Sequence, residues 1–155
     1  MKKKRIRKLQ LIGRRELVKF PLLCGDWVEA KIDTGAYTCS LHCYNIHEVP
    51  DGGKSKLYFS LFPGQFSVEG TPGYCFEQYE RKKIKSSTGE SEERYVVRTL
   101  IEIAGRKINT AISLADRGSM RFPVLIGRKL LKGKFIVDVS KVNTGGIIIE
   151  TEKSN

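Results

Sequence analysis

The sequence predicts a mostly β protein, closed or sandwich-like, with one short helix. Three observations favour this class. Short runs rich in β-branched and aromatic residues recur along the chain, most of them are bounded by Gly, Pro, Asn or Asp, and only one segment has the apolar spacing of a helix. The length of 155 residues suggests a single domain that buries most of its apolar surface.

The expected strands follow one another along the chain. The first two, ELVKFPLL (16–23) and DWVEAKID (26–33), lie around an expected turn at residues 24–26. The run RTLIEIAGRKINTAISL is typical of a hairpin that turns at residues 104–106. The other β-rich runs are residues 56–62, 66–70, 94–105, 107–115, 135–139 and 145–150.

Three further segments complete the expected architecture. GRKLLKG (127–133) predicts the short helix, since glycines frame it and Leu130 and Leu131 are its apolar pair. Residues 50–75 are rich in Pro and Gly and are expected to form a turn-rich excursion. KKIKSSTGESEER (82–94) has a polar tip at residues 86–93 between runs that can pair, which predicts a protruding hairpin.

The net charge of +11 is concentrated near the N-terminus. Residues 2–15 hold 8 of the 28 Lys and Arg residues, and the other 20 face 17 acidic residues, so the rest of the chain carries only about +3. We therefore divide the chain into a basic arm (1–10), one domain (11–150) and a short tail (151–155). The arm either keeps the protein soluble or attracts an acidic partner. No aromatic residue interleaves with it and no nucleic-acid-binding signature occurs, which argues against nucleic acid as the main partner.

Localisation is predicted from two missing signals. No apolar run approaches the roughly 20 residues that span a bilayer, and no secretory signal follows the charged start. We expect a soluble cytoplasmic protein with no membrane partner. The four cysteines are then expected to be free thiols in a reducing compartment.

The segment AKIDTGAYTCSLH (30–42) contains the candidate catalytic residue. Asp33 follows an apolar strand, Thr34 supplies a hydroxyl, and Gly35 allows a ligand or another backbone to approach closely. An Asp-Thr-Gly turn also follows strands by chance, so the tripeptide by itself leaves both interpretations open. The later segment FPVLIGRKLL (122–131) favours the catalytic one, because it places a Gly-Arg pair between apolar residues.

With both motifs, the chain resembles the retropepsin-like aspartic peptidases. Their half-domain carries an apolar-Asp-Thr-Gly-Ala motif and, later, an apolar-apolar-Gly-Arg-x-Leu-Leu motif that packs behind it. The resemblance is closer to a bacterial branch related to the ribosomal-protein glutamate ligase and often named "ATP-dependent zinc proteases". Phrases similar to IGRRELVKFP, AKIDTGAYTCSLH, KSSTGESEERYVVRT and LADRGSMRFPVLIGRKLLKGKFIVDVSK cover most of residues 12–141 in the same order.

The resemblance implies a closed β-barrel half-domain, the acid-protease fold, that cleaves peptide bonds as a homodimer. Aspartic peptidases use two carboxylates, and this chain has one Asp-Thr-Gly, so the second catalytic carboxylate would be Asp33 of a second copy. The terminal segments KRIRKLQLI (4–12) and GGIIIE (145–150) are candidate interface strands. The roles implied for other residues are hydrogen bonding across the dimer (Thr34), lining of the substrate backbone (Gly35, Ala36), bracing of the active-site loop (Gly127, Arg128) and the flap (Ser86, Ser87, Gly89).

The Cys/His cluster raises the question of a metal. Cys39, His42, Cys43 and His47 are residue types that zinc favours, but their spacing matches no familiar finger, and a strand would turn His42 and Cys43 to opposite faces. We therefore predict no metal and no cofactor. No phosphate-binding loop is present, so any ATP dependence would belong to a partner such as the ligase.

Two alternatives to the peptidase stay open at this point. One is a zinc-dependent hydrolase that uses the cluster, and the other is an inactive binding or regulatory module of the same fold that acts beside a glutamate ligase. The basic arm and the ligase-related branch together suggest an acidic or Glu-rich peptide as substrate.

Overall fold

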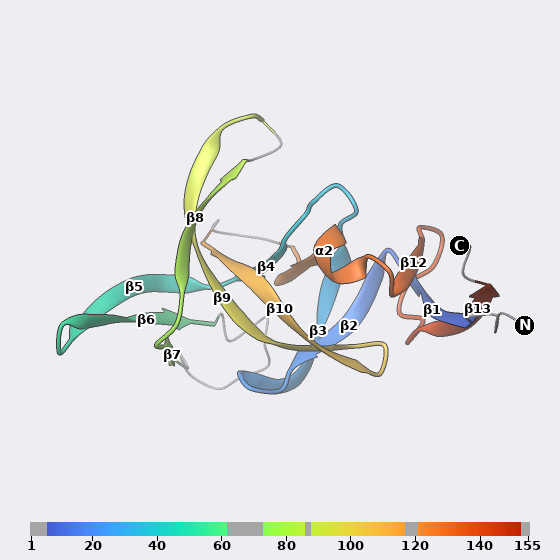
Figure 1. Ribbon diagram of the computed structural model, residues 1–155, viewed down its shortest axis with the longest axis horizontal. Coiled ribbons are helices and arrows are strands. Elements are labelled where there is room, and N and C mark those ends of the chain that lie inside the picture. Colours follow the sequence, from blue (N-terminus) through green and yellow to red (C-terminus); the bar gives the residue numbers. More distant parts are fainter. Residues whose placement is uncertain (1–5, 62–72, 86–87, 117–120, 153–155) are drawn as a thin grey trace, which may run out of the picture.

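The computed structural model describes residues 6–61, 73–85, 88–116 and 121–152. These residues form strands and a single short helix, which confirms the predicted class (Figure 1). No helix among them is long and apolar enough to cross a membrane. The elements are β1 (Ile6–Gly13), β2 (Arg15–Phe20), β3 (Cys24–Ile32), β4 (Cys39–His42), β5 (Tyr44–Asp51), β6 (Lys54–Ser60), β7 (Gly73–Phe76), β8 (Glu80–Lys85), β9 (Ser91–Ile103), β10 (Arg106–Ala115), β11 (Val124–Ile126), α2 (Arg128–Leu131), β12 (Phe135–Asp138) and β13 (Ile147–Glu152).

The main sheet curls into a barrel-like ring. Its strand order is β10-β4-β11-β3-β2-β9-β8, and β9 also pairs with β10, so six of the strands close on themselves. β3 and β11 run parallel with Ile32 opposite Ile126, which brings the ends of these two strands together. β8 pairs with β9 outside the ring and forms the edge of the sheet.

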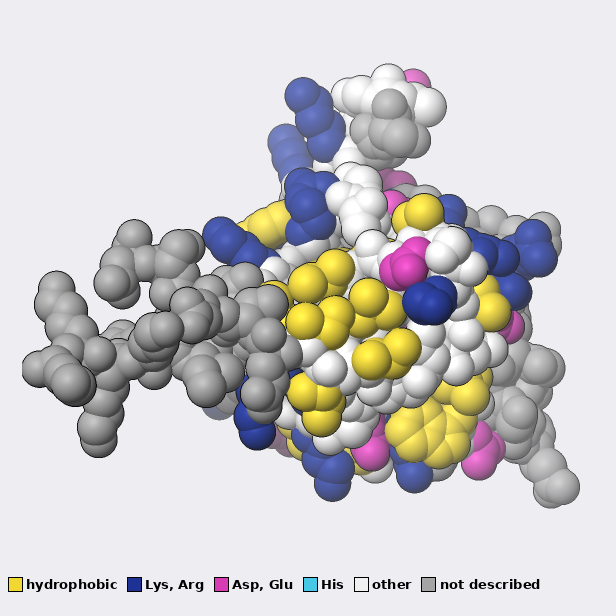
Figure 2. Space-filling view, turned by 90° about the vertical axis from the view of Figure 1, so that its right-hand side faces the viewer, with side chains coloured by type: hydrophobic (Ala, Val, Ile, Leu, Met, Phe, Trp, Pro, Cys, Tyr) yellow, Lys and Arg dark blue, Asp and Glu magenta, His cyan; other side chains and the backbone are white. Residues whose placement is uncertain are grey.

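The two ends of the chain meet in a separate three-stranded sheet, β12-β1-β13. β1 pairs antiparallel with β13 and parallel with β12, so the predicted terminal strands pair with each other within one chain. Large apolar side chains on this end remain solvent-exposed, and Figure 2, which views that end, shows hydrophobic side chains gathered on the surface. The exposed residues of this end are Ile136, Val139, Val142, Ile147 and Ile148. Residues 6–10 of the predicted arm lie within β1.

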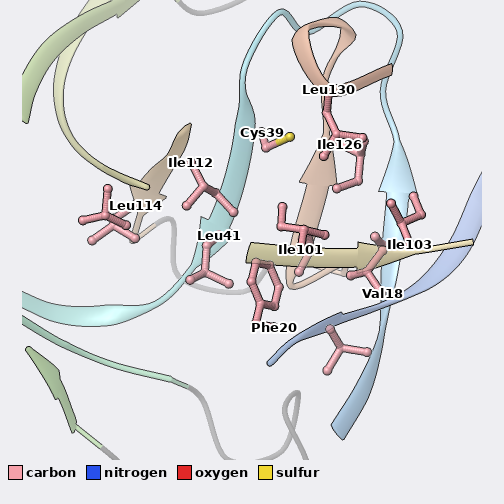
Figure 3. Close-up of a cluster of buried hydrophobic side chains, with 14 of the residues drawn as sticks. Val18, Phe20, Cys39, Leu41, Ile101, Ile103, Ile112, Leu114, Ile126 and Leu130 are labelled. Atoms are coloured by element: carbon pink, nitrogen blue, oxygen red, sulfur yellow. The ribbon is translucent and has the colours of Figure 1, made fainter. Parts of the chain in front are cut away.

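The hydrophobic core fills the ring. Side chains from β2, β4, β9 and β11 converge in its interior, where Phe20, Leu41, Ile101 and Ile126 are almost fully buried (Figure 3). Leu130 of α2 closes the core beside Ile126. Burying an aliphatic or aromatic side chain of this size stabilises the fold by about 1.5–3 kcal/mol.

The predicted hairpins and helix are confirmed. β9 and β10 turn through Ala104 and Gly105, which have φ values of 52° and 77° and thus the two positive φ angles of a type I′ turn. The protruding hairpin consists of β8 and β9, with Lys85 opposite Ser91, so its tip is shorter than the predicted 86–93. The predicted helix forms over Arg128–Leu131.

Two local expectations need correction. The first turn lies at residues 21–23 rather than 24–26, because Pro21 has no N–H for the ladder and the N–H of Leu23 donates to the carbonyl of Phe20 at 3.0 Å. Residues 50–75 are not only turns. β5 and β6 form a hairpin whose tight turn uses the positive φ of Gly52 and Gly53, and β7 adds a third strand. The predicted run at 66–70 lies outside the described residues.

Candidate active site

Asp33 lies at the first turn after β3, where the strand leaves the ring. Its backbone N–H donates to the carbonyl of Ile126 at 2.8 Å, which continues the pairing between β3 and β11 by one residue. The N–H of Gly35 donates to Asp33 Oδ1 at 3.0 Å, and the N–H of Ala36 donates to the Asp33 carbonyl at 3.2 Å. The carboxylate is partly exposed, so it is oriented by the loop and still accessible to a ligand.

Arg128 braces this loop from the start of α2. Its backbone N–H donates to the carbonyl of Ala36 at 2.8 Å, and its Nη1 donates to the carbonyl of Thr34 at 2.9 Å. The guanidinium also lies 5.9 Å from the centre of the Tyr37 ring, within the range of a cation–π contact. Arg128 therefore contacts the loop that carries Asp33 directly, and its bracing role stays a prediction.

Gly127 allows α2 to approach this loop. A Cβ atom at this position would lie 2.6 Å from the carbonyl oxygen of Thr38 and 2.7 Å from that of Tyr37. Both distances are well below van der Waals contact, and both atoms belong to backbone rather than to flexible side chains. The carbonyl of Tyr37 is also held by the N–H of Lys129 at 2.9 Å. A side chain at position 127 would therefore push the helix away from the Asp33 loop.

We expect Gly127→Ala to lower the free energy of unfolding by about 2–3 kcal/mol, the cost of overpacking against backbone. Urea unfolding of the variant and of the wild type measures this loss. Gly73→Ala is the matched control, since a Cβ at Gly73 would meet nothing within 4 Å. Equal losses in the two variants would contradict the predicted close approach.

A groove of about 670 Å³ opens at Asp33. One side consists of the Asp33 loop with Arg128, and the other is the β8–β9 hairpin. Among the described residues that line the groove, Asp33 is the only acid, and the basic residues outnumber it. The lining residues are Asp33, Gly35, Ala36, Tyr37, Thr38, Ser40, Lys83, Ile84, Lys85, Arg94, Ser113, Leu125 and Arg128.

The structure brings together most of the predicted site residues. Asp33, Gly35, Ala36 and Arg128 line the groove, whereas Thr34 and Gly127 do not. Thr34 belongs to the Asp33 loop and its carbonyl accepts from Arg128, and Gly127 packs against the backbone of the same loop. Gly89 lies at the exposed tip of the hairpin with a φ of 85°. The other predicted flap residues, Ser86 and Ser87, lie outside the described residues.

The sequence reasoning missed the hairpin residues that line the groove. Lys83, Ile84 and Lys85 come from β8, and Arg94 comes from β9. The side chain of Arg94 is only 6% exposed, and its guanidinium forms an ion pair with Glu92 at 3.3 Å. The available signal was the position of Arg94 at the start of the apolar run RYVV. A charged residue in such a strand either lies on its exposed face or belongs to a binding site.

The Cys/His cluster is dispersed. Cys39 begins β4 and Cys43 directly follows it, and both are buried. His47 is exposed on β5, where its ring stacks on Tyr58. Within the described parts of the chain, no three His, Cys, Asp or Glu side chains lie close enough together to hold a metal ion. Burial raises the pKa of the Cys39 thiol from 9.0 to about 11 and that of the Cys43 thiol to about 12.

These two thiols are expected to make stability fall at alkaline pH. Above pH 9.0 the unfolded chain releases the thiol protons while the folded chain keeps them up to about 11 and about 12, so rising pH favours unfolding. Each thiol contributes up to about 1.4 kcal/mol per pH unit in this window. Urea unfolding at several pH values should therefore show a smaller alkaline loss in a Cys39→Ala, Cys43→Ala variant than in the wild type, and an equal loss would contradict the assignment.

The comparison with known families agrees with this geometry. A family model described as RimB-like, "Retropepsin-like aspartic endopeptidase RimB", matches residues 11–145, which include the Asp33 loop, the hairpin and α2. The chain belongs to the RimB-like family. The retropepsin-like resemblance that the two motifs suggested is thereby confirmed, together with the mostly β fold.

Similar proteins place this RimB-like chain in a wider context. A "Probable alpha-L-glutamate ligase" of Shewanella pealeana is 35% identical over 131 residues, and one of Shewanella halifaxensis is 34% identical. Each alignment covers 84% of this chain but 29% of the ligase, so the chain spans less than a third of these relatives. A solved Legionella pneumophila protein of unknown function superposes with a TM-score of 0.68 at 26% identity, over 87% of this chain and 97% of that one.

Proposed function

We propose that the chain is an aspartic endopeptidase of the retropepsin type, with an active site formed by Asp33 from two copies. The observation that carries this proposal is the Asp33 loop. The partly exposed carboxylate accepts a hydrogen bond from the N–H of Gly35 and is open to a groove of about 670 Å³, and Arg128 holds the loop through the carbonyls of Thr34 and Ala36. Membership of the RimB-like family supports the same reaction.

The proposed mechanism needs both carboxylates. Two close carboxylates share one proton, because like charges at short distance do not both ionise readily. The ionised Asp33 removes a proton from water, which attacks the peptide carbonyl, and the protonated Asp33 of the partner donates its proton to the carbonyl oxygen. Asp33 then gives the proton it took from water to the amide nitrogen, and the carbon–nitrogen bond breaks. The partner's Asp33 takes a proton back from a hydroxyl of the tetrahedral intermediate, so the pair again shares one proton.

The second copy is proposed to dock through the sheet formed by the two ends of the chain. β12 and β13 are its edge strands, and the exposed apolar side chains of this end would be buried by a two-fold contact. Of the interface strands that the sequence suggested, residues 6–12 lie in β1 and residues 147–150 lie in β13 of this sheet. We propose the homodimer on this basis.

An acidic or Glu-rich peptide is the proposed substrate. Lys83, Lys85, Arg94 and Arg128 surround the groove beside Asp33, and their positive charge would attract carboxylates. The basic residues 2–5 precede β1 and would add to this attraction over a longer range. A cytoplasmic location remains our expectation for such an enzyme.

The names of the relatives are the observation behind one alternative, the binding module. The matched region makes up 29% of longer proteins that are named as glutamate ligases. A domain similar to this chain is therefore part of those longer proteins. The chain would then bind a peptide in the groove, beside an ATP-dependent ligase partner, without cleaving it. The zinc-dependent hydrolase is the other alternative from the sequence, and no three His, Cys, Asp or Glu side chains of the described residues support it.

One preparation separates these functions. The purified chain is incubated with an oligoglutamate peptide and with a neutral peptide of equal length, its mass in solution is measured, and its zinc content is determined. The aspartic peptidase is expected to be a dimer that cleaves the acidic peptide and keeps its activity in a chelator. Binding without cleavage would support the module, and stoichiometric zinc with loss of activity in chelator would support the zinc hydrolase.

A further inference from the structure

Glu48 on β5 links two separate sheets. Its carboxylate accepts a hydrogen bond from the Tyr79 hydroxyl at 2.5 Å, one from the Tyr95 hydroxyl at 3.2 Å, and an ion-paired hydrogen bond from the Arg81 guanidinium. All three donors belong to the β8–β9 hairpin or border it: Tyr79 directly precedes β8, Arg81 lies in β8 and Tyr95 lies in β9. Glu48 itself belongs to the sheet β5-β6-β7.

The three donors also pack against one another. The ring centres of Tyr79 and Tyr95 lie 5.9 Å apart in an edge-to-face arrangement, and the Arg81 guanidinium lies 5.5 Å from the centre of the Tyr95 ring. The Glu48 side chain is 25% exposed, so the cluster is partly shielded from water. Charge-assisted hydrogen bonds in such a setting are stronger than those between neutral groups.

The cluster lies where the hairpin leaves the ring. β9 pairs with β10 only as far as Val96, opposite Ser113, and Val96 also begins the pairing of β9 with β8, opposite Glu80. Arg81 and Tyr95 are the next cross-strand pair and the first beyond the support of β10. Figure 1 shows the β8–β9 hairpin projecting from the ring, with β5 beside it.

The projecting part of the hairpin forms one wall of the groove. Lys83, Ile84, Lys85 and Arg94 line the groove, and all of them lie beyond the Arg81–Tyr95 pair. Lys85 is four residues from Arg81 along a strand, about 13 Å at the usual rise per residue. A small tilt at the base therefore moves the groove wall relative to Asp33.

We propose that Glu48 is a positioning residue that fastens the base of the β8–β9 hairpin and so fixes the groove wall that faces Asp33. This inference deepens the proposed peptidase function and rests on it for its effect on substrate. Glu48 lines no part of the groove described above and acts through Arg81, Tyr79 and Tyr95.

Hydrogen exchange tests the fastening directly. In Glu48→Ala, the amides of residues 81–85 and 91–95 are expected to exchange about tenfold faster or more, while those of β2 and β3 keep their rates. Glu48→Gln keeps one carbonyl acceptor but loses the charge facing Arg81, so its exchange rates should lie between those of the wild type and those of Glu48→Ala. This variant provides the test if the alanine variant does not fold. Glu29→Ala is the matched control, since Glu29 pairs with Arg15 at 3.0 Å on the ring, outside the hairpin.

Kinetics with an oligoglutamate peptide tests the positioning. Glu48→Ala is expected to raise KM about tenfold and to change kcat much less, because a displaced wall weakens substrate binding and leaves Asp33 in place. Unchanged hairpin exchange in folded variants, or faster exchange with an unchanged KM, would overturn the proposal. A wild type that cleaves nothing would refute the proposed function instead, and the exchange rates would still decide whether Glu48 fastens the hairpin.

Discussion

Asp33→Asn is expected to lower the rate of peptide cleavage by about 10³-fold or more, because an amide neither removes a proton from water nor donates one to the carbonyl oxygen. The asparagine side chain keeps the size of the aspartate, and its amide oxygen still accepts from the N–H of Gly35. The fold is therefore expected to persist, which circular dichroism and urea unfolding check. The measurement is cleavage of a labelled oligoglutamate peptide.

Subunit mixing shows whether two copies share the site. When equal amounts of wild type and Asp33→Asn exchange subunits freely, only dimers with two wild-type chains are active, so the mixture should retain about one quarter of the activity of the same total amount of wild type. Half the activity would indicate that each chain works alone and would contradict the two-carboxylate mechanism. Asp26→Asn, an exposed substitution on β3, is the control that should leave cleavage unchanged.

Glu16→Ala is expected to cause the largest loss of stability, about 3–5 kcal/mol. Glu16 is 2% exposed, and its carboxylate accepts from the backbone N–H groups of Gly13, Thr144 and Gly145 at 2.8–3.1 Å and from the Thr144 hydroxyl at 3.0 Å. Alanine leaves these donors without their acceptor. A loss of this size is a large share of the total stability of a domain, which is about 5–15 kcal/mol.

Urea unfolding of Glu16→Ala and of Glu29→Ala separates burial from charge. Glu29 is a partly exposed carboxylate in a surface ion pair, so its removal should cost at most about 1 kcal/mol. The free energy of unfolding should therefore fall much further in the first variant. Similar losses would show that the buried network around Glu16 contributes little beyond an ordinary charge.

The features that the sequence predicted well depend on residues close together in the chain. The turn at Ala104–Gly105, the helix that begins at Arg128 and the strand that leads into Asp33 each follow from local residue types and from the alternation or spacing of neighbours. The pairing of the Asp33 loop with Arg128 was reached through the resemblance, because no local pattern joins residues 94 positions apart.

Other features were not predictable from local patterns. Residues 24–26 carry turn-forming Gly and Asp, yet they lie in β3, because Pro21 ends the preceding strand and the ladder resumes at Cys24. Glu16 and Glu48 look like exposed charges in alternating strands. Their partners lie up to 129 residues away for Glu16 and 47 for Glu48, so neither network has a local signature.

The sequence by itself determined the strand content, the hairpins, the short helix and the position of Asp33 at a strand end, because these depend on short-range backbone preferences and on apolar alternation. Only the tertiary structure decided which charged side chains face the groove and which hold distant segments together. Closing the ring brings β8 and β9 opposite the Asp33 loop and β5 against the hairpin base. Such contacts arise from chain closure over long separations, which no short stretch of residues specifies.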